Sequence, residues 1–289
     1  MTRTEAEKGP GPGARSQESR RQFIAERVLE HGTVTVTWLA AKTGVSVMTV
    51  HRDLDELARR GVLRRFRGGV SAQPSSVFES NLDYRLGVHV AEKEAIARAA
   101  AALIEPGMSV MLDDSTTALA LARLLPEPGT APLTVLTNAR RVIDVFTERE
   151  DVRLIGLGGE YSRTHDSFLG MPCVEAVEAL SVDLVLVSTS AMNARMTFHQ
   201  EQDVVLVKRA MLRSGTRTAL LMDHSKLART ALHRLCPVAD FDHVVLDAGV
   251  EPRLLAELRE QTDVRVAETG SAGGPGSTRG TSSTGSAGK

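Results

Sequence analysis

The chain has 289 residues, of which 42% are apolar, 3% aromatic and 25% charged, and its formal net charge is −1. This length favours two ordinary domains, each able to bury its own core. No apolar run approaches the roughly 20 residues needed to span a bilayer, and the N-terminus lacks the apolar segment of a signal peptide, so we expect a cytoplasmic protein without a membrane partner.

The cysteines and the distribution of charge narrow the possibilities further. Cys173 and Cys236 lie far apart without a CxxC pair, which favours buried thiols over a disulfide or a metal site. Residues 1–70 carry 13 Lys and Arg against 8 Asp and Glu, whereas the remainder carries 22 against 28. Only the N-terminal part therefore favours a polyanionic partner.

Composition also divides the chain into segments. Residues 1–15 and 269–289 contain few large apolar side chains, so we predict that they are disordered tails. Between them we predict a first domain at 16–72, a linker at 73–88 that begins with a Ser- and Pro-rich stretch, and a second domain at 89–268.

Three helices are predicted in the first domain. Ser19 can cap the first of them, which carries Phe23, Ile24, Val28 and Leu29 at helical spacing. Thr37 is the expected N-cap of a short second helix, and Gly44 supplies the turn after it.

The third predicted helix begins after Ser46, its expected N-cap, and has a clear apolar face. Val50, Leu54 and Leu57 fall at i, i+4 and i+7, so this face must be buried. The opposite face carries polar and charged side chains that can meet bases and phosphates. Two helices joined by a short turn, with the second one exposed in this way, indicate a helix-turn-helix.

A short basic stretch follows Gly61. Three arginines and a Gly-Gly pair there predict a two-stranded wing whose guanidinium groups bind DNA phosphates. The alternative is a generic three-helix unit whose charges only keep its surface hydrated. The candidate DNA-binding residues are Ser46, Met48, Thr49, His51, Arg52, Arg64, Arg65 and Arg67.

The stretch LAAKTGVSVMTVHRDLDELARRGVLRRFRGGV, residues 39–70, strongly resembles the helix-turn-helix signature of the DeoR family of bacterial transcription regulators. The resemblance implies binding to a double-stranded DNA operator, most simply as a repressor of carbohydrate metabolism genes. His51 departs from the family, which usually has arginine at this position. The neutral and shorter imidazole changes how this position can contact a phosphate or a guanine.

In the second domain, apolar runs that predict strands alternate with helical patterns. There are six such runs, at residues 109–114, 133–138, 152–159, 182–190, 217–223 and 243–249. Continuous apolar strands of this kind predict an α/β fold with a mostly parallel sheet covered on both faces. The resemblance extends over nearly all of this region. It implies a fold of the sugar-phosphate isomerase and CoA-transferase type that senses a phosphorylated sugar or a related metabolite.

Polar residues follow several of these strands, and the carboxyl ends of parallel strands share one edge of a sheet. Ser115, Thr116 and Thr117 lead from a strand into a helix, an arrangement that suits phosphate. The family has glycine where this chain has Ser115, and the resemblance places Lys226 of its D-x-S-K motif beside the effector. The candidate effector-binding residues are Asp114, Ser115, Thr116, Thr117, Thr137, Asn138, Gly158, Gly159, Glu201, Lys208 and Lys226.

Other functions stay open at this point. The GLGGEY run lacks the last glycine of a dinucleotide fingerprint, and His199, Glu201 and Asp203 have no second cluster that would complete a metal site. We therefore expect no cofactor, no metal and no catalytic residue. The rivals are an isomerase-like enzyme that uses Asp113, Asp114 or Glu201 as a base, and a constitutive DNA-binding protein whose second domain only dimerises. The expected partners are operator DNA, a phosphorylated metabolite and a second copy of the chain.

Overall fold

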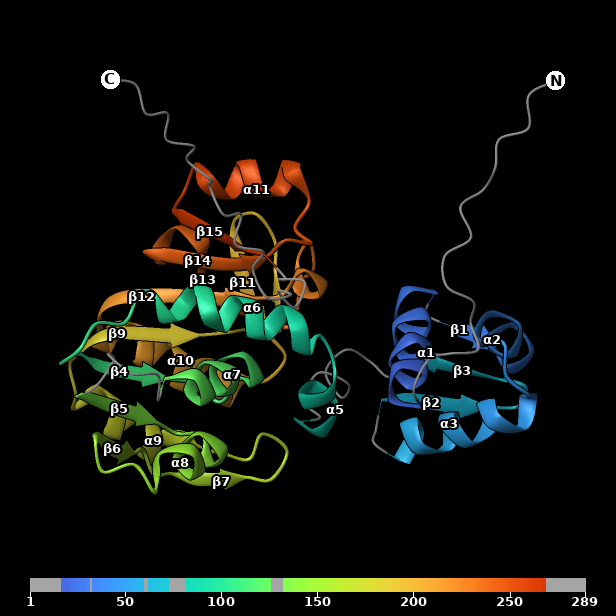
Figure 1. The fold of residues 1–289 in the computed structure, drawn as a ribbon, viewed down its shortest axis with the longest axis horizontal. Coiled ribbons are helices and arrows are strands. Elements are labelled where there is room, and N and C mark those ends of the chain that lie inside the picture. Colours follow the sequence, from blue (N-terminus) through green and yellow to red (C-terminus); the bar gives the residue numbers. More distant parts are fainter. Residues whose placement is uncertain (1–16, 32, 60–61, 73–81, 126–131, 269–289) are drawn as a thin grey trace, which may run out of the picture.

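The computed structural model describes residues 17–31, 33–59, 62–72, 82–125 and 132–268. The predicted tails and the first part of the predicted linker lie outside these residues. Within them, two units each have their own hydrophobic core (Figure 1). No helix in the described part of the chain is long and apolar enough to cross a bilayer.

The first unit is a winged helix-turn-helix, as predicted. Its three strands form an antiparallel sheet in the order β1-β3-β2. Buried apolar side chains from all three helices and the wing make one core. The elements are α1 (Gln17–His31), β1 (Thr33–Thr35), α2 (Val36–Thr43), α3 (Val47–Arg59), β2 (Leu63–Phe66) and β3 (Gly69–Ala72).

Two helix starts differ from the prediction. Helix α1 begins at Gln17, so Ser19 lies inside it rather than capping it. The N-cap of α2 is Thr35, whose Oγ1 accepts a hydrogen bond from the Trp38 amide at 3.3 Å, and Thr37 lies within the helix. Both residues can cap a helix, and the pairing of β1 with the wing decides in favour of Thr35, because it places this residue at the point where the strand ends.

The third helix and the wing agree with the prediction. Ser46 Oγ accepts from the Thr49 amide at 3.2 Å, and the stripe of Val50, Leu54 and Leu57 is buried. The wing turns at Gly68, whose φ of 90° favours glycine.

The second half of the predicted linker is a helix. Helix α5 (Leu82–Gly87) packs against α7 (Thr116–Leu124), and Leu86 contacts the core of the second unit. An apolar pair four residues apart is too short a pattern to reveal such a helix in the sequence. Residues 82–87 therefore belong to the second unit and not to a linker.

The second unit is built on a fully parallel seven-stranded sheet in the order β15-β14-β12-β9-β4-β5-β6. This confirms the predicted α/β fold class, although the edge strand β15 was not expected. The strands are β4 (Ser109–Leu112), β5 (Leu133–Thr137), β6 (Val152–Gly156), β9 (Val182–Val187), β12 (Gly215–Met222), β14 (His243–Asp247) and β15 (Asp263–Ala267).

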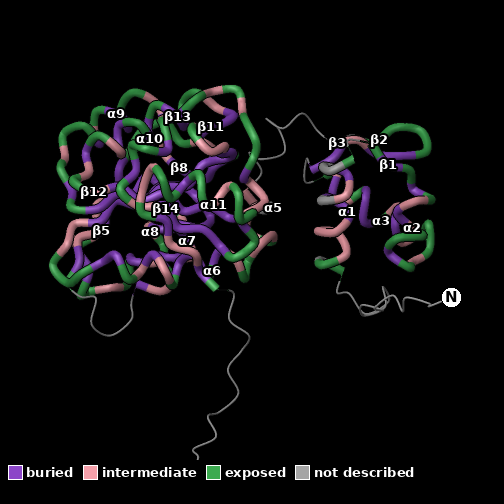
Figure 2. Tube along the Cα trace, turned by 90° about the horizontal axis from the view of Figure 1, so that it is seen from above, coloured by how far each residue is buried: buried purple, intermediate pink, exposed green. Residues whose placement is uncertain are grey.

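Helices cover both faces of this sheet (Figure 1). Alternate residues of the strands enter different cores: Leu184 and Leu186 lie in the core beneath α6, α7 and α8, whereas Val185 and Val187 lie in the core beneath α9 and α10. Figure 2 shows the sheet as the buried centre of this unit. The helices are α6 (Val90–Ala101), α8 (Arg140–Phe146), α9 (Gly170–Glu178), α10 (Gln202–Ser214) and α11 (Pro252–Arg259).

Two small antiparallel sheets border the carboxyl ends of the parallel strands, and neither was predicted. One is the hairpin of β7 (Glu160–Ser162) and β8 (Ser167–Leu169), and the other joins β10 (Ala191–Met192), β11 (Met196–His199) and β13 (His233–Pro237). The chain order of the parallel sheet reverses between β4 and β9. Strands β5 and β6 lie on one side of β4, and the later strands of this sheet, β9, β12, β14 and β15, lie on the other. Ligands of open α/β sheets bind at such a reversal, outside the carboxyl ends of the strands.

Candidate functional site

The first turns of α3 expose a surface that can contact DNA. Met48 is 63% exposed, and Arg52 is also exposed and has no ion pair within the part of the chain that the structure describes. The next residue, Asp53, is buried and accepts from Nε of Arg20 at 2.6 Å and from Nε of Arg21 at 3.1 Å. Asp53 thus joins α3 to α1, which leaves Arg52 available on the outer face.

Ser46 and Thr49 shape the start of this surface. Their hydroxyl oxygens lie 3.0 Å apart, and Ser46 also caps the helix. Both therefore fix the end of the helix that would enter a DNA groove, in addition to any contact of their own.

The wing is attached to α3 through Arg65. Its Nη2 lies 2.7 Å from Nδ1 of His51, and its Nη1 forms an ion pair with Asp55. His51 accepts this hydrogen bond in the tautomer that carries its proton on Nε2, whereas an arginine at position 51 would repel Arg65. Arg67 is exposed and has no ion pair among the described residues, and the side chain of Arg64 lies outside them.

In the second unit, a buried acidic pair lies where β4 ends, at the reversal of strand order. Asp113 accepts from the amides of Ser115 at 3.0 Å and Ser188 at 2.7 Å, so it ties β4 to β9. The buried Lys208 ammonium binds Asp113 and also donates to Asp114 Oδ1 at 2.9 Å. Lys208 therefore balances part of the charge of the acidic pair and does not line the pocket described below, so its predicted role in binding the effector stays a prediction.

The electrostatics of this pair follow from that contact. Burial by itself would raise the pKa of Asp114, but the Lys208 ammonium and His165 hold it well below its ordinary value. Burial would lower the pKa of Lys208, and the two carboxylates outweigh this and raise it. The charged forms of Asp114 and Lys208 stabilise each other, and two aspartates facing one lysine leave a local excess of negative charge.

His165, from the loop between β7 and β8, extends this cluster toward Glu201. Its Nε2 lies 3.0 Å from Glu201 Oε2, an ion-pair distance without hydrogen-bond alignment, and Ser167 donates to Asp114 Oδ2 at 3.0 Å. The centre of the His199 ring lies 6.0 Å from that of the His165 ring. Burial and the nearby Lys208 ammonium lower the pKa of His199 to about 3. His199 is therefore neutral at physiological pH.

A corner of hydroxyl and amide groups lies beside Asp114. Ser115 Oγ caps α7 by accepting from the Ala118 amide at 3.0 Å. Thr117 Oγ1 and Asn138 Oδ1 are buried and have no hydrogen-bond partner among the described residues, although Asn138 Nδ2 donates to the Phe168 carbonyl at 2.8 Å. Buried polar atoms without partners are costly, so this corner suits a polar ligand or an ordered water.

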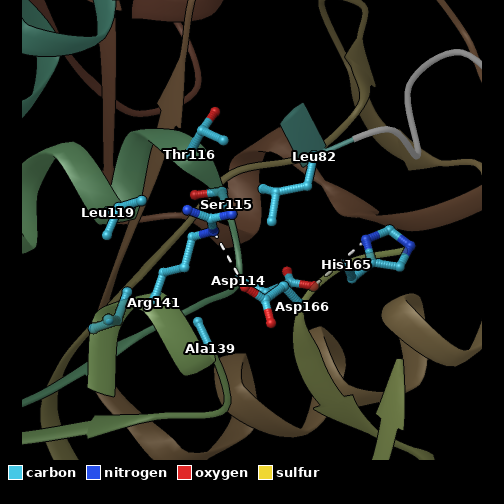
Figure 3. A pocket seen from close by; sticks show the side chains of 10 residues that line it. Leu82, Asp114, Ser115, Thr116, Leu119, Ala139, Arg141, His165 and Asp166 are labelled. Carbon is cyan, nitrogen blue, oxygen red and sulfur yellow. Dashed lines mark ion pairs between the residues drawn. The ribbon is translucent and has the colours of Figure 1, made fainter. Parts of the chain in front are cut away.

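These groups adjoin a small pocket, which we call the effector pocket (Figure 3). Its volume of about 10 Å³ has room for one water, so a larger ligand requires its walls to separate. The predicted residues Asp114, Ser115 and Thr116 line it. Sequence reasoning missed the others, because they converge only in the fold: Leu82, Leu119, Ala139, Arg141, Val142, His165 and Asp166.

Lys226 lies close to this region without lining the pocket. Its Nζ is 3.3 Å from Ser188 Oγ and 3.6 Å from Asp223 Oδ2. Burial would raise the pKa of Asp223, but Lys226 lowers it to about 2, so Asp223 is ionised at neutral pH. The amide of Ser188 binds Asp113, which links Lys226 to the acidic pair.

Two of the other predicted residues, Thr137 and Gly159, have local structural roles. Thr137 Oγ1 accepts from the Ala139 amide at 3.1 Å. A side chain at Gly159 would place its Cβ 2.5 Å from the Leu169 carbonyl, so this glycine permits β7 and β8 to pack closely, and Gly158 is exposed. None of the three lines the effector pocket.

Among the described residues, no three potential metal ligands converge. Cys173 and Cys236 are free thiols, and burial raises the pKa of each to about 11. Both thiols are therefore weakly ionised and weakly reactive; Cys173 is buried, as predicted, whereas Cys236 is half-buried.

Two family models match this chain. Residues 20–76 match the model of a DeoR-like helix-turn-helix domain, and residues 88–248 match that of a DeoR C terminal sensor domain. The chain is 31% identical over 250 residues to an uncharacterized HTH-type transcriptional regulator, YgbI, of Escherichia coli K12, a match that covers 86% of this chain and 97% of the relative.

Two further relatives have more specific names. A putative aga operon transcriptional repressor of Escherichia coli O157:H7 is 30% identical over 83% of this chain and 90% of its own. The HTH-type transcriptional repressor GlcR of Bacillus subtilis is 30% identical over 80% of this chain and 88% of its own. Among solved structures, ribose 5 phosphate isomerase A from Neisseria gonorrhoeae has a TM-score of 0.36 and 11% identity over 47% of this chain and 52% of that one, which is too remote to bear on function.

Proposed function

Since this chain belongs to the DeoR family of DNA-binding transcription regulators, we propose that it is a cytoplasmic repressor of carbohydrate genes whose second unit binds a phosphorylated sugar. The effector changes operator affinity because it binds one arrangement of the molecule better than another, with a coupling of roughly 1 to 3 kcal/mol. The acting form is a homo-oligomer, and the protein uses no cofactor.

The observation that carries the effector proposal is the hydroxyl corner at the start of α7. Thr116 borders the effector pocket, and Thr117 has a buried hydroxyl without a partner. A phosphate there would accept from these hydroxyls and from free amides of the first helical turn. Lys226, connected through Ser188, supplies the counter-charge that the buried Lys208 cannot supply.

The chain is a regulator and not an enzyme, as the names of its relatives indicate. The state of the carboxylates agrees with this. An isomerase needs a carboxylate base whose pKa lies near the operating pH, whereas Lys208 and His165 hold the pKa of Asp114 far below that range.

A thermal-shift titration with glucose 6-phosphate, 6-phosphogluconate and fructose 1,6-bisphosphate tests the effector proposal. A ligand at a hundred times its Kd stabilises the folded state by about 2.7 kcal/mol and raises the Tm. Lys226→Ala should weaken binding about ten- to a hundredfold, because it removes a charge-assisted contact. Arg229→Ala, an exposed change three residues further along, is the control. Unchanged melting with every sugar phosphate would refute the proposal.

A further inference from the structure

Three arginines surround an open pocket next to the effector pocket. This arginine pocket has a volume of about 460 Å³ and is lined by Leu82, Arg140, Arg141, Tyr161, Arg163, Thr164 and Asp166. Two of the arginines come from the start of α8, and Arg163 comes from the loop between β7 and β8. These two segments are adjacent, since the amide of Arg140 donates to the Asp166 carbonyl at 3.1 Å.

Asp166 is the one acidic group in this lining, and it organises part of the pocket. It accepts from Arg140 Nε at 2.6 Å and Nη2 at 2.8 Å, and from the Tyr161 hydroxyl at 2.6 Å. Its Oδ2 also lies 3.1 Å from Arg141 Nε. Its hydrogen bond with Arg140 lowers the pKa of its carboxyl, so it stays ionised. Arg140 Nη1 also donates to Asp144 Oδ2 at 2.9 Å. Arg163 adds a third guanidinium, so three positive charges stand against two negative ones and the surroundings of the pocket are positive.

None of these contacts involves Arg163. It is exposed, and it has no ion pair with any acidic group in the described part of the chain. The ion pairs of Arg140 and Arg141 with Asp166 hold the β7–β8 loop against α8, and Arg163 takes no part in that. Its charge remains available to a ligand.

The two pockets share part of their lining. Leu82, Arg141 and Asp166 line both of them, and Figure 3 shows Arg141 and Asp166 beside Asp114 and Ser115. A ligand whose phosphate lies at the hydroxyl corner can therefore extend past Leu82 toward the arginines. The far end of such a ligand would meet the guanidinium groups of the arginines, which bind carboxylate and phosphate in a bidentate manner.

We propose that the arginine pocket binds a second anionic group of the effector. This inference rests on the proposed function and narrows it: the effector is a sugar phosphate that carries a second phosphate or a carboxylate at its other end. A neutral sugar end would leave the positive lining without a counter-charge. The hydroxyl corner and Lys226 bind the first phosphate, and Arg141 and Arg163 bind the second anionic group.

Calorimetric titration of the full chain with a matched pair of probes tests this. Glucose 6-phosphate carries one anionic group, and 6-phosphogluconate adds a carboxylate at the other end of the same carbon chain. Fructose 1,6-bisphosphate provides a second phosphate instead. We expect at least one doubly anionic probe to bind about tenfold more tightly than glucose 6-phosphate, the size of effect that one charge-assisted contact gives.

Arg163→Ala should abolish this preference, and Arg123→Ala, which removes an exposed arginine at the end of α7, should retain it. Equal affinity for all three probes in the wild type, or a preference that survives in Arg163→Ala, would overturn the inference. In both cases the proposed function stands if Lys226→Ala still weakens binding. If none of the probes binds the wild type, the phosphate site fails and the second subsite fails with it.

Discussion

Arg52 and Asp53 are neighbours in the sequence but serve opposite sides of α3. Asp53 binds two arginines of α1 from a buried position, whereas Arg52 is exposed beside Met48. The same division explains His51, which accepts a hydrogen bond from the wing through Arg65. Within one turn of α3, His51 and Asp53 thus fix the orientation of the helix, and Arg52 remains available to DNA.

Arg52→Ala should therefore weaken operator binding selectively. If Arg52 contacts a base edge, its loss costs about 1 to 3 kcal/mol on the operator and relaxes specificity at that base pair. Arg59→Ala is the control on the same helix, since Arg59 is exposed and pairs with Glu56. Fluorescence anisotropy on operator and scrambled duplexes measures both. Equal losses for the two variants on both duplexes would mean that Arg52 contributes only charge.

For single residues, the sequence predicts the features that depend only on neighbouring positions in the chain. The cap at Ser46 and the stripe of Val50, Leu54 and Leu57 follow from spacing alone. His165 and Arg141 had no such signal, because their neighbours come from distant strands. The burial of Lys208 against Asp113 and Asp114 had no such signal either, because these residues are distant in the sequence.

Among the elements, α5 has the most consequential position. It follows the connection from the DNA-binding unit, and its Leu82 lines both pockets of the second unit. The buried ammonium of Lys93 donates to the carbonyls of Arg85 and of Val88, the latter at 2.7 Å, and so fixes the end of α5. Burial and the nearby Lys226 lower the pKa of Lys93 to about 7. Because the effector pocket has room for one water, a bound sugar phosphate would have to separate its walls, and Leu82 of α5 is part of them.

Lys93→Met should loosen α5 while preserving the volume of the side chain. The two carbonyls lose their donor, and an unsatisfied buried group costs about 1 to 3 kcal/mol. Hydrogen exchange measured by mass spectrometry should rise about tenfold or more at residues 82–88, because local opening becomes less costly by that amount. Glu94→Gln, an exposed change on the same helix, is the control. Unaltered exchange at 82–88 in Lys93→Met would show that Lys93 does not hold α5.

The element scale also shows where sequence patterns lose information. Six of the seven parallel strands were predicted from continuous apolar runs, because burial on both faces leaves that pattern. The strand β15 was missed, since its residues Asp263 and Arg265 interrupt the apolar run at the edge of the sheet. Helix α5 was assigned to the linker for a similar reason, as six residues are too few for periodicity to be visible.

For the whole molecule, the strand order explains why the predicted residues converge as far as they do. Asp114 to Thr117 follow β4, and Ser188 and Lys226 follow the next two strands on the other side of the reversal. Gly158 and Gly159 follow β6 at the edge and lie outside the effector pocket. The rule that strand ends share one edge predicts the neighbourhood, and the order of the strands decides which ends are close.

We expect the acting form to be at least a dimer. One helix-turn-helix covers too little DNA for high specificity, and paired recognition helices read half-sites about one helical turn or more apart. Light scattering coupled to size exclusion should give a dimer or a larger assembly at micromolar concentration. Removing residues 269–289 should preserve it, since they contain few large apolar side chains to bury. A monomer that retains full operator affinity would contradict this.

The most direct test of the account is the operator affinity of the full chain as a function of sugar phosphate concentration. With an operator obtained by selection from genomic fragments, anisotropy at constant salt should show that a doubly anionic sugar phosphate changes the Kd for DNA by about five- to 150-fold. In Lys226→Ala, the operator affinity without ligand should match the wild type, and about ten- to a hundredfold more ligand should be needed for the same response. A ligand response in Lys226→Ala identical to that of the wild type would contradict the role of Lys226 as the counter-charge of the phosphate, and no response in either protein would contradict the claim that a sugar phosphate controls DNA binding.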